Sequence, residues 1–256
     1  RVERSRDTHR HGASPNGIST SLDAHGFLEL ASDMKLFIGN KAYSSWSLRG
    51  WLAAKHSGLA FEEVTVPLYD EAWNQRREGD EFAPSGGKVP ILWDGDDIVV
   101  WDSLAIIDYL NEKTGGTRGY WPDDMAARAM ARSMAAEMHS SFAALRRNHS
   151  MNIRRIYPAA PLLPEVQADV VRILQIWAEA RARFGSQGDY LFGDWSAADM
   201  MFAPVVSRFI TYSIALPPFV LAHMQAVIRH PCMQDWIGGA QAEDWIIEKF
   251  EGPLEE

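Results

Sequence analysis

The strongest structural signal in the chain is the stretch Lys35-Leu-Phe-Ile-Gly-Asn-Lys-Ala-Tyr-Ser-Ser-Trp-Ser-Leu-Arg49. Its apolar run at 36–38 is typical of a short β-strand, and a loop with glycine and asparagine follows. Ser44, Ser45 and Ser47 stand at the start of a predicted helix, where one serine hydroxyl is expected to cap a free N–H. Three serines exceed that need. Because a helix N-terminus attracts negative charge, the surplus hydroxyls predict an anion site here.

Strands and helices continue to alternate after this first helix. Strand-like segments follow at 61–66, 89–93 and 97–101, and a helix is predicted at 102–110. A helix after the first strand predicts a parallel pair, whereas the Asp-Gly turn between the last two strands predicts an antiparallel pair. A glycine-rich run then ends this region. We therefore expect an α/β domain at 34–114.

The chain from 120 to 256 has apolar positions that recur with the period of a helix. Asp123 is predicted to cap a long helix that continues to about Arg147. Pro164 is predicted to open a second helix, and Ser196-Ala-Ala-Asp199 is a capping box at the start of another. These segments predict an all-helical second domain.

Residues 1–33 differ in composition from the rest of the chain. They are rich in arginine, serine, histidine and glycine, and their apolar residues gather at 27–31. Met34 stands directly before the first strand. We expect residues 1–33 to form a disordered tail or an upstream extension outside the fold.

The composition narrows the classes of partner. The 256 residues carry a formal net charge of −9, which argues against nucleic-acid binding because such proteins present basic surfaces. The pairs Arg146-Arg147 and Arg154-Arg155 are interpreted as solvated helix ends. No apolar run reaches the roughly 18 residues of a membrane helix, and no clustered ligand set predicts a metal. The one cysteine, Cys232, excludes an intrachain disulfide and favours a reducing, cytoplasmic location.

Four motifs, in this order and spacing, resemble those of the cytosolic glutathione S-transferases. They are Ser44-Ser-Trp-Ser-Leu-Arg49, Lys88-Val89-Pro90, Asp102-Ser103 and Ser196-x-x-Asp199. The resemblance covers the chain from Met34 to its C-terminus, and the serine run is closest to the zeta class, which includes maleylacetoacetate isomerases. It implies a thioredoxin-like, glutathione-binding α/β domain, an all-helical substrate domain at 120–256, and a homodimer.

The resemblance identifies the expected anion as the thiolate of glutathione. Ser44, with Ser45 as the alternative, would be the catalytic hydroxyl that forms a hydrogen bond with the sulfur. Lowering the pKa of a thiol from about 9 to near 7 requires about 2.7 kcal/mol. A charge-assisted hydrogen bond contributes roughly 1.5–3 kcal/mol, and the helix terminus adds roughly 0.3–1 kcal/mol. The two together suffice, so no general base is expected.

The resemblance also implies which residues hold the tripeptide. Val89 would pair its backbone with the cysteinyl unit, because it precedes Pro90, the proline that this family holds in the cis form. Asp102, where the family usually has Glu or Gln, would bind the γ-glutamyl ammonium, and Ser103 would bind the neighbouring carboxylate. Lys88 would bind the glycyl carboxylate.

A second substrate is expected between the two halves, where ligand sites are common. The candidates to line its pocket are Tyr43 and Trp46 from the first half, together with Met138, His139 and Phe142 from the predicted long helix.

The predicted function is a detoxifying transferase that conjugates glutathione to small electrophiles. The alternatives are a glutathione-dependent cis–trans isomerase of the maleylacetoacetate type, a non-catalytic module with the same fold, reductive ether cleavage of aryl substrates, and dehalogenation with glutathione as cofactor. The isomerases have cysteine where this chain has Trp46, which counts against the first alternative. The expected partners are glutathione, a small electrophile and a second copy of the chain, without metal, nucleic acid or membrane.

Overall fold

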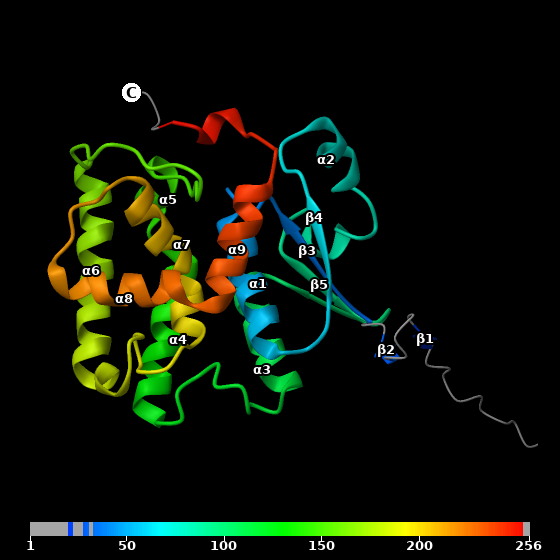
Figure 1. Ribbon diagram of the computed structural model, residues 1–256, viewed down its shortest axis with the longest axis horizontal. Coiled ribbons are helices and arrows are strands. Elements are labelled where there is room, and N and C mark those ends of the chain that lie inside the picture. Colours follow the sequence, from blue (N-terminus) through cyan, green and yellow to red (C-terminus); the bar gives the residue numbers. More distant parts are fainter. Residues whose placement is uncertain (1–19, 23–27, 31–32, 253–256) are drawn as a thin grey trace, which may run out of the picture. The chain divides into compact units, whose positions relative to one another are not determined.

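The structure is a computed structural model that describes residues 20–22, 28–30 and 33–252 (Figure 1). No helix among these residues combines the length and the apolar character needed to cross a membrane.

The chain divides into two units, Arg1–Ser32 and Asp33–Glu256. In the first unit, β1 (Thr20–Leu22) pairs in antiparallel fashion with β2 (Leu28–Leu30). Asp33, the last residue of the predicted tail, belongs to the second unit, and the remaining residues of the tail lie outside the described residues.

A mixed four-stranded sheet forms the first part of the second unit. The strand order is β4-β3-β5-β6. As predicted, β3 pairs with β4 in parallel fashion, and β5 pairs with β6 in antiparallel fashion. The bounds are β3 (Met34–Gly39), β4 (Glu62–Val66), β5 (Ile91–Asp94) and β6 (Ile98–Trp101).

The sheet is covered on both faces because its side chains alternate. Leu36 and Ile38 of β3 belong to the main hydrophobic cluster, which also contains residues of α1 (Ser45–Ser57) and α3 (Ser103–Lys113). Phe37 points to the other face and packs in a second cluster with Trp73 of α2 (Glu71–Arg76). The arrangement of a mixed sheet between helices is the thioredoxin-like architecture that the sequence predicts.

Helix α1 passes very close to the loop before β5. The peptide bond between Val89 and Pro90 is cis, as predicted. A Cβ atom at Gly50 of α1 would lie 2.9 Å from Cγ of Pro90, so only glycine fits at this helix position. The close packing brings the N-terminal turn of α1 next to the cis-proline loop.

The second part of the unit is helical, as predicted. Its hydrophobic residues join those of α1 and α3 in one continuous cluster, with Trp177, Phe202 and Trp236 among its largest fully buried side chains. The helices are α4 (Met125–Ser140), α5 (Ala143–Asn148), α6 (Pro164–Phe184), α7 (Ala197–Thr211), α8 (Pro218–Arg229) and α9 (Pro231–Ala242).

The long helix predicted from Asp123 to about Arg147 is wrong in two respects. Its N-cap is Asp124, and the segment breaks into α4 and α5 at Phe142, whose φ is 62°. A guanidinium N–H of Arg146 donates to the backbone oxygens of Met138 and His139, so the side chain satisfies carbonyls at the end of α4. The periodicity of apolar residues does not reveal such a break, because α4 and α5 both keep their apolar faces toward the core.

The capping box at the start of α7 is confirmed. The Asp199 carboxylate is fully buried and accepts hydrogen bonds from the backbone N–H of Ser196 at 3.0 Å, the Ser196 hydroxyl at 2.9 Å and the backbone N–H of Leu191 at 3.1 Å. Burial nevertheless raises its pKa to about 6. The box therefore ties the loop before α7 to the helix itself.

His223 of α8 is expected to make the fold sensitive to acid. Its imidazole lies 3% exposed beside Trp177, and burial lowers its pKa to about 4. Because the folded pKa lies below the unfolded value, stability present above pH 6.5 is lost as the pH falls toward 4, by up to roughly 3 kcal/mol. The raised pKa of Asp199 acts in the opposite direction between pH 6 and 4, so the wild-type protein alone would show only the net effect.

The variant His223→Phe removes the imidazole, whose Nδ1 lies 3.9 Å from Oδ1 of Asp199. We expect the difference in unfolding free energy between this variant and the wild type, measured in urea at pH 7 and pH 4.5, to shift in favour of the variant in acid. A difference that is the same at both pH values would contradict the prediction.

Candidate active site

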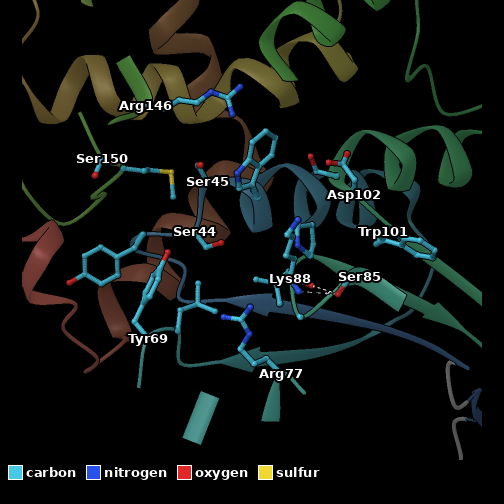
Figure 2. A pocket seen from close by; sticks show the side chains of 18 of the residues that line it. Ser44, Ser45, Tyr69, Arg77, Ser85, Lys88, Trp101, Asp102, Arg146 and Ser150 are labelled. Atoms are coloured by element: carbon cyan, nitrogen blue, oxygen red, sulfur yellow. Dashed lines mark hydrogen bonds between the residues drawn. The ribbon is translucent and has the colours of Figure 1, made fainter. Parts of the chain in front are cut away.

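A cavity of about 740 Å³ opens where the first turns of α1 and α3, the cis-proline loop and the α4–α5 region meet. Figure 2 shows Ser44 and Ser45 in its middle, with Lys88 and Ser85 on one side and Arg146 on the other. Ten of the residues predicted from the sequence line this cavity: Tyr43, Ser44, Ser45, Trp46, Lys88, Val89, Pro90, Asp102, Ser103 and His139.

Ser44 is the N-cap of α1. Its hydroxyl oxygen accepts from the Ser47 N–H at 3.4 Å, and its hydroxyl donates to Oγ of Ser47 at 2.8 Å. Ser47 is fully buried, and its Oγ also accepts the backbone N–H of Gly39 at 2.9 Å. The Ser44 hydroxyl is therefore hydrogen-bonded to Ser47 in the first turn of α1, and Ser44 also lines the cavity.

Ser45 lies one residue further, inside the first turn of α1. It is half-buried and lines the cavity, and its carbonyl oxygen accepts an N–H of Arg49 at 3.1 Å. Both serines therefore reach the same space at the positive end of one helix. The two candidates for the catalytic hydroxyl lie side by side in the cavity.

Asp102 and Ser103 open α3 on another wall of the cavity. One Asp102 oxygen accepts the Leu104 N–H at 2.8 Å as the N-cap, and the other contacts Nε2 of His139 at 2.6 Å. Oγ of Ser103 is buried and has no hydrogen-bond partner among the described residues. An unpaired buried hydroxyl is costly, so this position is well suited to a ligand's polar group.

The cis-proline loop forms the opposite wall. The Ser85 hydroxyl accepts the Lys88 N–H at 3.0 Å and donates to the Lys88 carbonyl at 2.7 Å, which fixes the loop before Val89. The Lys88 side chain is exposed and reaches the cavity, as does Pro90. Arg77 lines the same wall and was not anticipated from the sequence.

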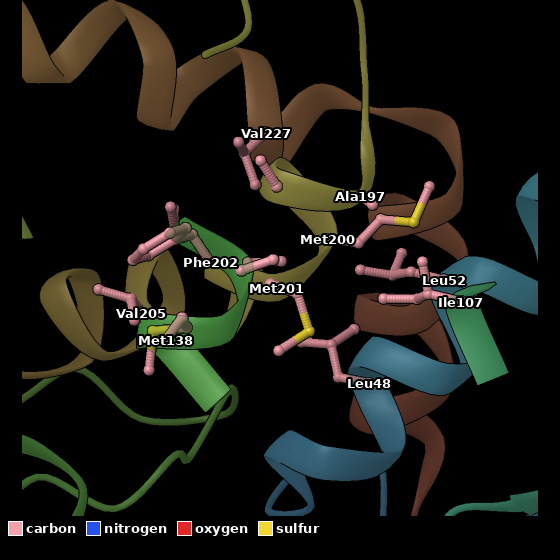
Figure 3. Packing of buried hydrophobic residues seen from close by; sticks show 14 of the residues in the cluster. Leu48, Leu52, Ile107, Met138, Ala197, Met200, Met201, Phe202, Val205 and Val227 are labelled. Carbon is pink, nitrogen blue, oxygen red and sulfur yellow. The ribbon is translucent and has the colours of Figure 1, made fainter. Parts of the chain in front are cut away.

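The predicted second-substrate residues separate into two groups. Tyr43, Trp46 and His139 line the cavity. Met138 is fully buried in the hydrophobic core, where Figure 3 shows it, and Phe142 is 4% exposed. Neither is among the lining residues, because the break between α4 and α5 turns this apolar stripe toward the core.

The interpretation of Arg146-Arg147 as a solvated helix end is wrong for the first residue. Arg147 is exposed, whereas Arg146 is half-buried, lines the cavity and places its guanidinium carbon 4.6 Å from the Trp46 ring centroid. Arg208 of α7 also lines the cavity although it is only 4% exposed. No sequence motif marks Arg208, and only the packing of α7 brings it here.

The charge of the cavity is opposite to that of the chain. Arg77, Lys88, Arg146 and Arg208 line it, against the single carboxylate of Asp102, whereas the whole chain has a formal charge of −9. A concave site with concentrated positive charge attracts anionic ligands. Among the described residues, no group of three or more His, Cys, Asp and Glu side chains is arranged to hold a metal.

Comparison with known proteins identifies a family model and solved structures that this chain resembles. Residues 43–113 match the family model of the glutathione S-transferase N-terminal domain. A Burkholderia glutathione transferase homologue with bound glutathione superposes with a TM-score of 0.59 at 24% identity, over 82% of this chain and 98% of that one. The chain has the glutathione S-transferase fold. The family-model match and the shared fold together support the glutathione S-transferase family.

Two further relatives extend the comparison. The theta class glutathione S-transferase of Xanthomonas axonopodis pv. citri, solved with glutathione, has a TM-score of 0.58 at 19% identity, over 80% of this chain and 97% of that one. A dichloromethane dehalogenase of Methylorubrum extorquens is 40% identical over 63 residues, which are 25% of this chain and 21% of the dehalogenase. The match therefore spans about a fifth of that curated relative.

Proposed function

We propose that the protein is a glutathione S-transferase that conjugates the glutathione thiolate to small electrophiles. The observation that carries the proposal is the gathering of the serine pair at the start of α1, the cis-proline loop and the start of α3 around one cationic cavity. Glutathione has two carboxylates, one ammonium group and a thiol. The cavity offers basic side chains for the carboxylates, one acid for the ammonium group and a helix N-terminus for the sulfur.

Binding uses both walls of the cavity. Asp102 accepts the γ-glutamyl ammonium, and the unpaired Ser103 hydroxyl donates to the adjacent carboxylate at the positive end of α3. Lys88 attracts the glycyl carboxylate, and the backbone of Val89 pairs with the cysteinyl unit. The sulfur is thereby directed toward the first turn of α1.

Ionisation of the thiol is assisted by Ser44. The hydroxyls of Ser44 and Ser47 lie 2.8 Å apart, and either can rotate to donate to the other. When Ser47 donates, the Ser44 proton is free to point at the sulfur, and the Gly39 N–H still holds the Ser47 oxygen. The hydrogen bond from Ser44 and the N-terminus of α1 stabilise the thiolate at neutral pH.

The thiolate then attacks the electrophilic carbon of a substrate in the rest of the cavity. The electron pair of the sulfur forms the new S–C bond, and the bond to the leaving group breaks or, in an addition, a π bond accepts the charge. The chain has to position two reactants and stabilise an anion, which needs no nucleophile of its own.

Glutathione-dependent dehalogenation is a second candidate. The match of 63 residues to a dichloromethane dehalogenase favours it. The first step is the same attack, with halide as the leaving group. The zeta-class assignment, the isomerase alternative and the homodimer remain predictions from the sequence.

One experiment tests these functions together. The protein is first titrated with glutathione in a calorimeter, and then incubated with a panel of aryl halides, alkyl halides and a cis-dienone diacid. We expect binding and a glutathione conjugate. Halide release without an accumulating conjugate would identify dehalogenation, and isomerised diacid with unchanged glutathione would identify the isomerase. A folded protein that binds glutathione with no reaction would support the non-catalytic module.

The variant Asp102→Asn is expected to weaken glutathione binding about tenfold while kcat changes little. Asparagine retains the N-cap of α3 but removes the negative charge that faces the ammonium group. Glu112→Gln, at an exposed position on the same helix, is the matched control. Equal KM values for glutathione in the wild type and Asp102→Asn would contradict the assignment.

A further inference from the structure

Three arginines cluster at the helical side of the cavity. Arg146 comes from α5 and Arg208 from α7, and both line the cavity. Arg49 of α1 is fully buried behind Trp46, with its guanidinium carbon 4.7 Å from the ring centroid. Burial and the charges of Arg146 and Arg208 lower the pKa of Arg49, whereas the Asp102 carboxylate raises it. Burial and the charge of Arg146 lower the pKa of Arg208 to about 10. The guanidinium carbon of Arg146 lies 4.6 Å from the same Trp46 ring centroid, so the charges of Arg49 and Arg146 are neighbours, and Arg208 shares the cavity with Arg146.

No carboxylate forms an ion pair with any of these arginines within the described part of the chain. Arg49 donates to the carbonyl oxygens of Met201 and Ser45, at 2.8 and 3.1 Å. Arg208 donates to those of His149 and Pro204, at 2.8 and 3.3 Å.

The third member of the cluster follows the same pattern. Arg146 donates to the carbonyl oxygens of Met138 and His139, and its Nε is buried without a partner. Backbone carbonyls satisfy N–H groups but do not neutralise charge. Buried charges in proteins are normally paired, but Asp102 and Asp169 act on Arg49 and Arg146 only from beyond ion-pair distance, so the positive charge of the cluster is only partly compensated.

We infer that this end of the cavity binds a carboxylate of the second substrate, so that the protein acts on electrophiles that carry an anionic group. Arg146 and Arg208 are the groups that face the carboxylate, and Trp46, Met151 and Phe250 line the cavity for the apolar part of the molecule. The inference rests on the proposed function, because it names the substrate class of the same site.

In the proposed arrangement, glutathione does not supply the carboxylate that these arginines bind. Its carboxylates are assigned to Lys88 and to Ser103, and Figure 2 shows Lys88 and Arg146 on opposite sides of the serine pair. The sulfur at Ser44 therefore lies between the tripeptide and the arginines. A carboxylate held at Arg146 would place the attached carbon skeleton toward the sulfur, which is the geometry that conjugation requires.

Two matched electrophiles test the inference. 4-(Chloromethyl)benzoate and 4-(chloromethyl)benzamide have nearly the same shape, and in both the thiolate displaces chloride from the benzylic carbon. After correction for the uncatalysed rates, we expect kcat/KM to be at least about tenfold higher for the benzoate. Arg146→Gln should remove most of this preference. Arg147→Gln, the exposed neighbour on the same helix, should keep it.

A binding measurement without chemistry keeps the test decisive if Arg146→Gln fails to fold. The wild-type protein is titrated with 4-methylbenzoate and with 4-methylbenzamide, and binding is followed by calorimetry. About tenfold tighter binding of the benzoate supports the anion site, whether or not the chloromethyl compounds react. If neither chloromethyl compound reacts, only the transferase function is refuted. Turnover of both compounds with equal kcat/KM, or equal binding of the two methyl compounds, overturns the inference and leaves the transferase function standing.

Discussion

Replacing Ser44 with alanine is expected to lower kcat/KM for glutathione conjugation by between about thirtyfold and a hundredfold. The change removes the one charge-assisted hydrogen bond from α1 to the thiolate, which corresponds to about 2–3 kcal/mol of transition-state stabilisation. The pKa of bound glutathione should rise as well. It can be measured from the ultraviolet absorbance of the thiolate as a function of pH.

Ser45→Ala is the matched control for this prediction, because Ser45 lines the same cavity from the next position of the helix. Ser44→Thr keeps a hydroxyl and should restore most of the rate. Since Ser44 also caps α1, its loss should lower stability by only about 1 kcal/mol, which thermal unfolding separates from the catalytic effect. A thiol pKa that is unchanged in Ser44→Ala but raised in Ser45→Ala would transfer the role to Ser45.

The largest effect on stability is expected from Asp199→Ala, at about 3–5 kcal/mol of unfolding free energy. The substitution leaves the N–H groups of Ser196 and Leu191 and the Ser196 hydroxyl without an acceptor inside the protein. Chemical denaturation at pH 7 measures the loss directly.

Asp124→Ala provides the comparison. Asp124 has the same capping role at α4, where it accepts the Ala127 N–H at 2.8 Å, but it is exposed and water can replace it. Its loss should cost about 1 kcal/mol. Equal losses in the two variants would show that burial adds nothing to the Asp199 box.

Features that depend on residues close together in the sequence were predicted better than features that depend on packing between distant segments. A serine cap at the start of the first helix, the capping box at Ser196 and the cis bond at Pro90 were predicted correctly, whereas the cap expected at Asp123 is Asp124. Capping depends on residues three or four positions apart, so it can be read from the sequence directly. The position of Pro90 came from the family resemblance.

The pocket on the helical side was predicted less well. Met138 and Phe142 were expected there because they continue an apolar stripe, yet they lie in the core. The sequence contains no signal for the break at Phe142, which depends on how Arg146 closes the end of α4. Arg146 was interpreted as solvated because an arginine pair at a helix end usually is.

The sequence by itself determined the order of strands and helices in the α/β domain, the capping box of α7 and the serine-bearing turn, because each depends on neighbours along the chain. Only the tertiary structure decided that Arg49 of α1 and Arg146 of α5 meet beside Trp46, and that Arg208 of α7 lines the same cavity as Arg146. Such a meeting depends on the packing of α1, α5 and α7 against one another. Long-range packing of this kind leaves no periodic trace in a single sequence.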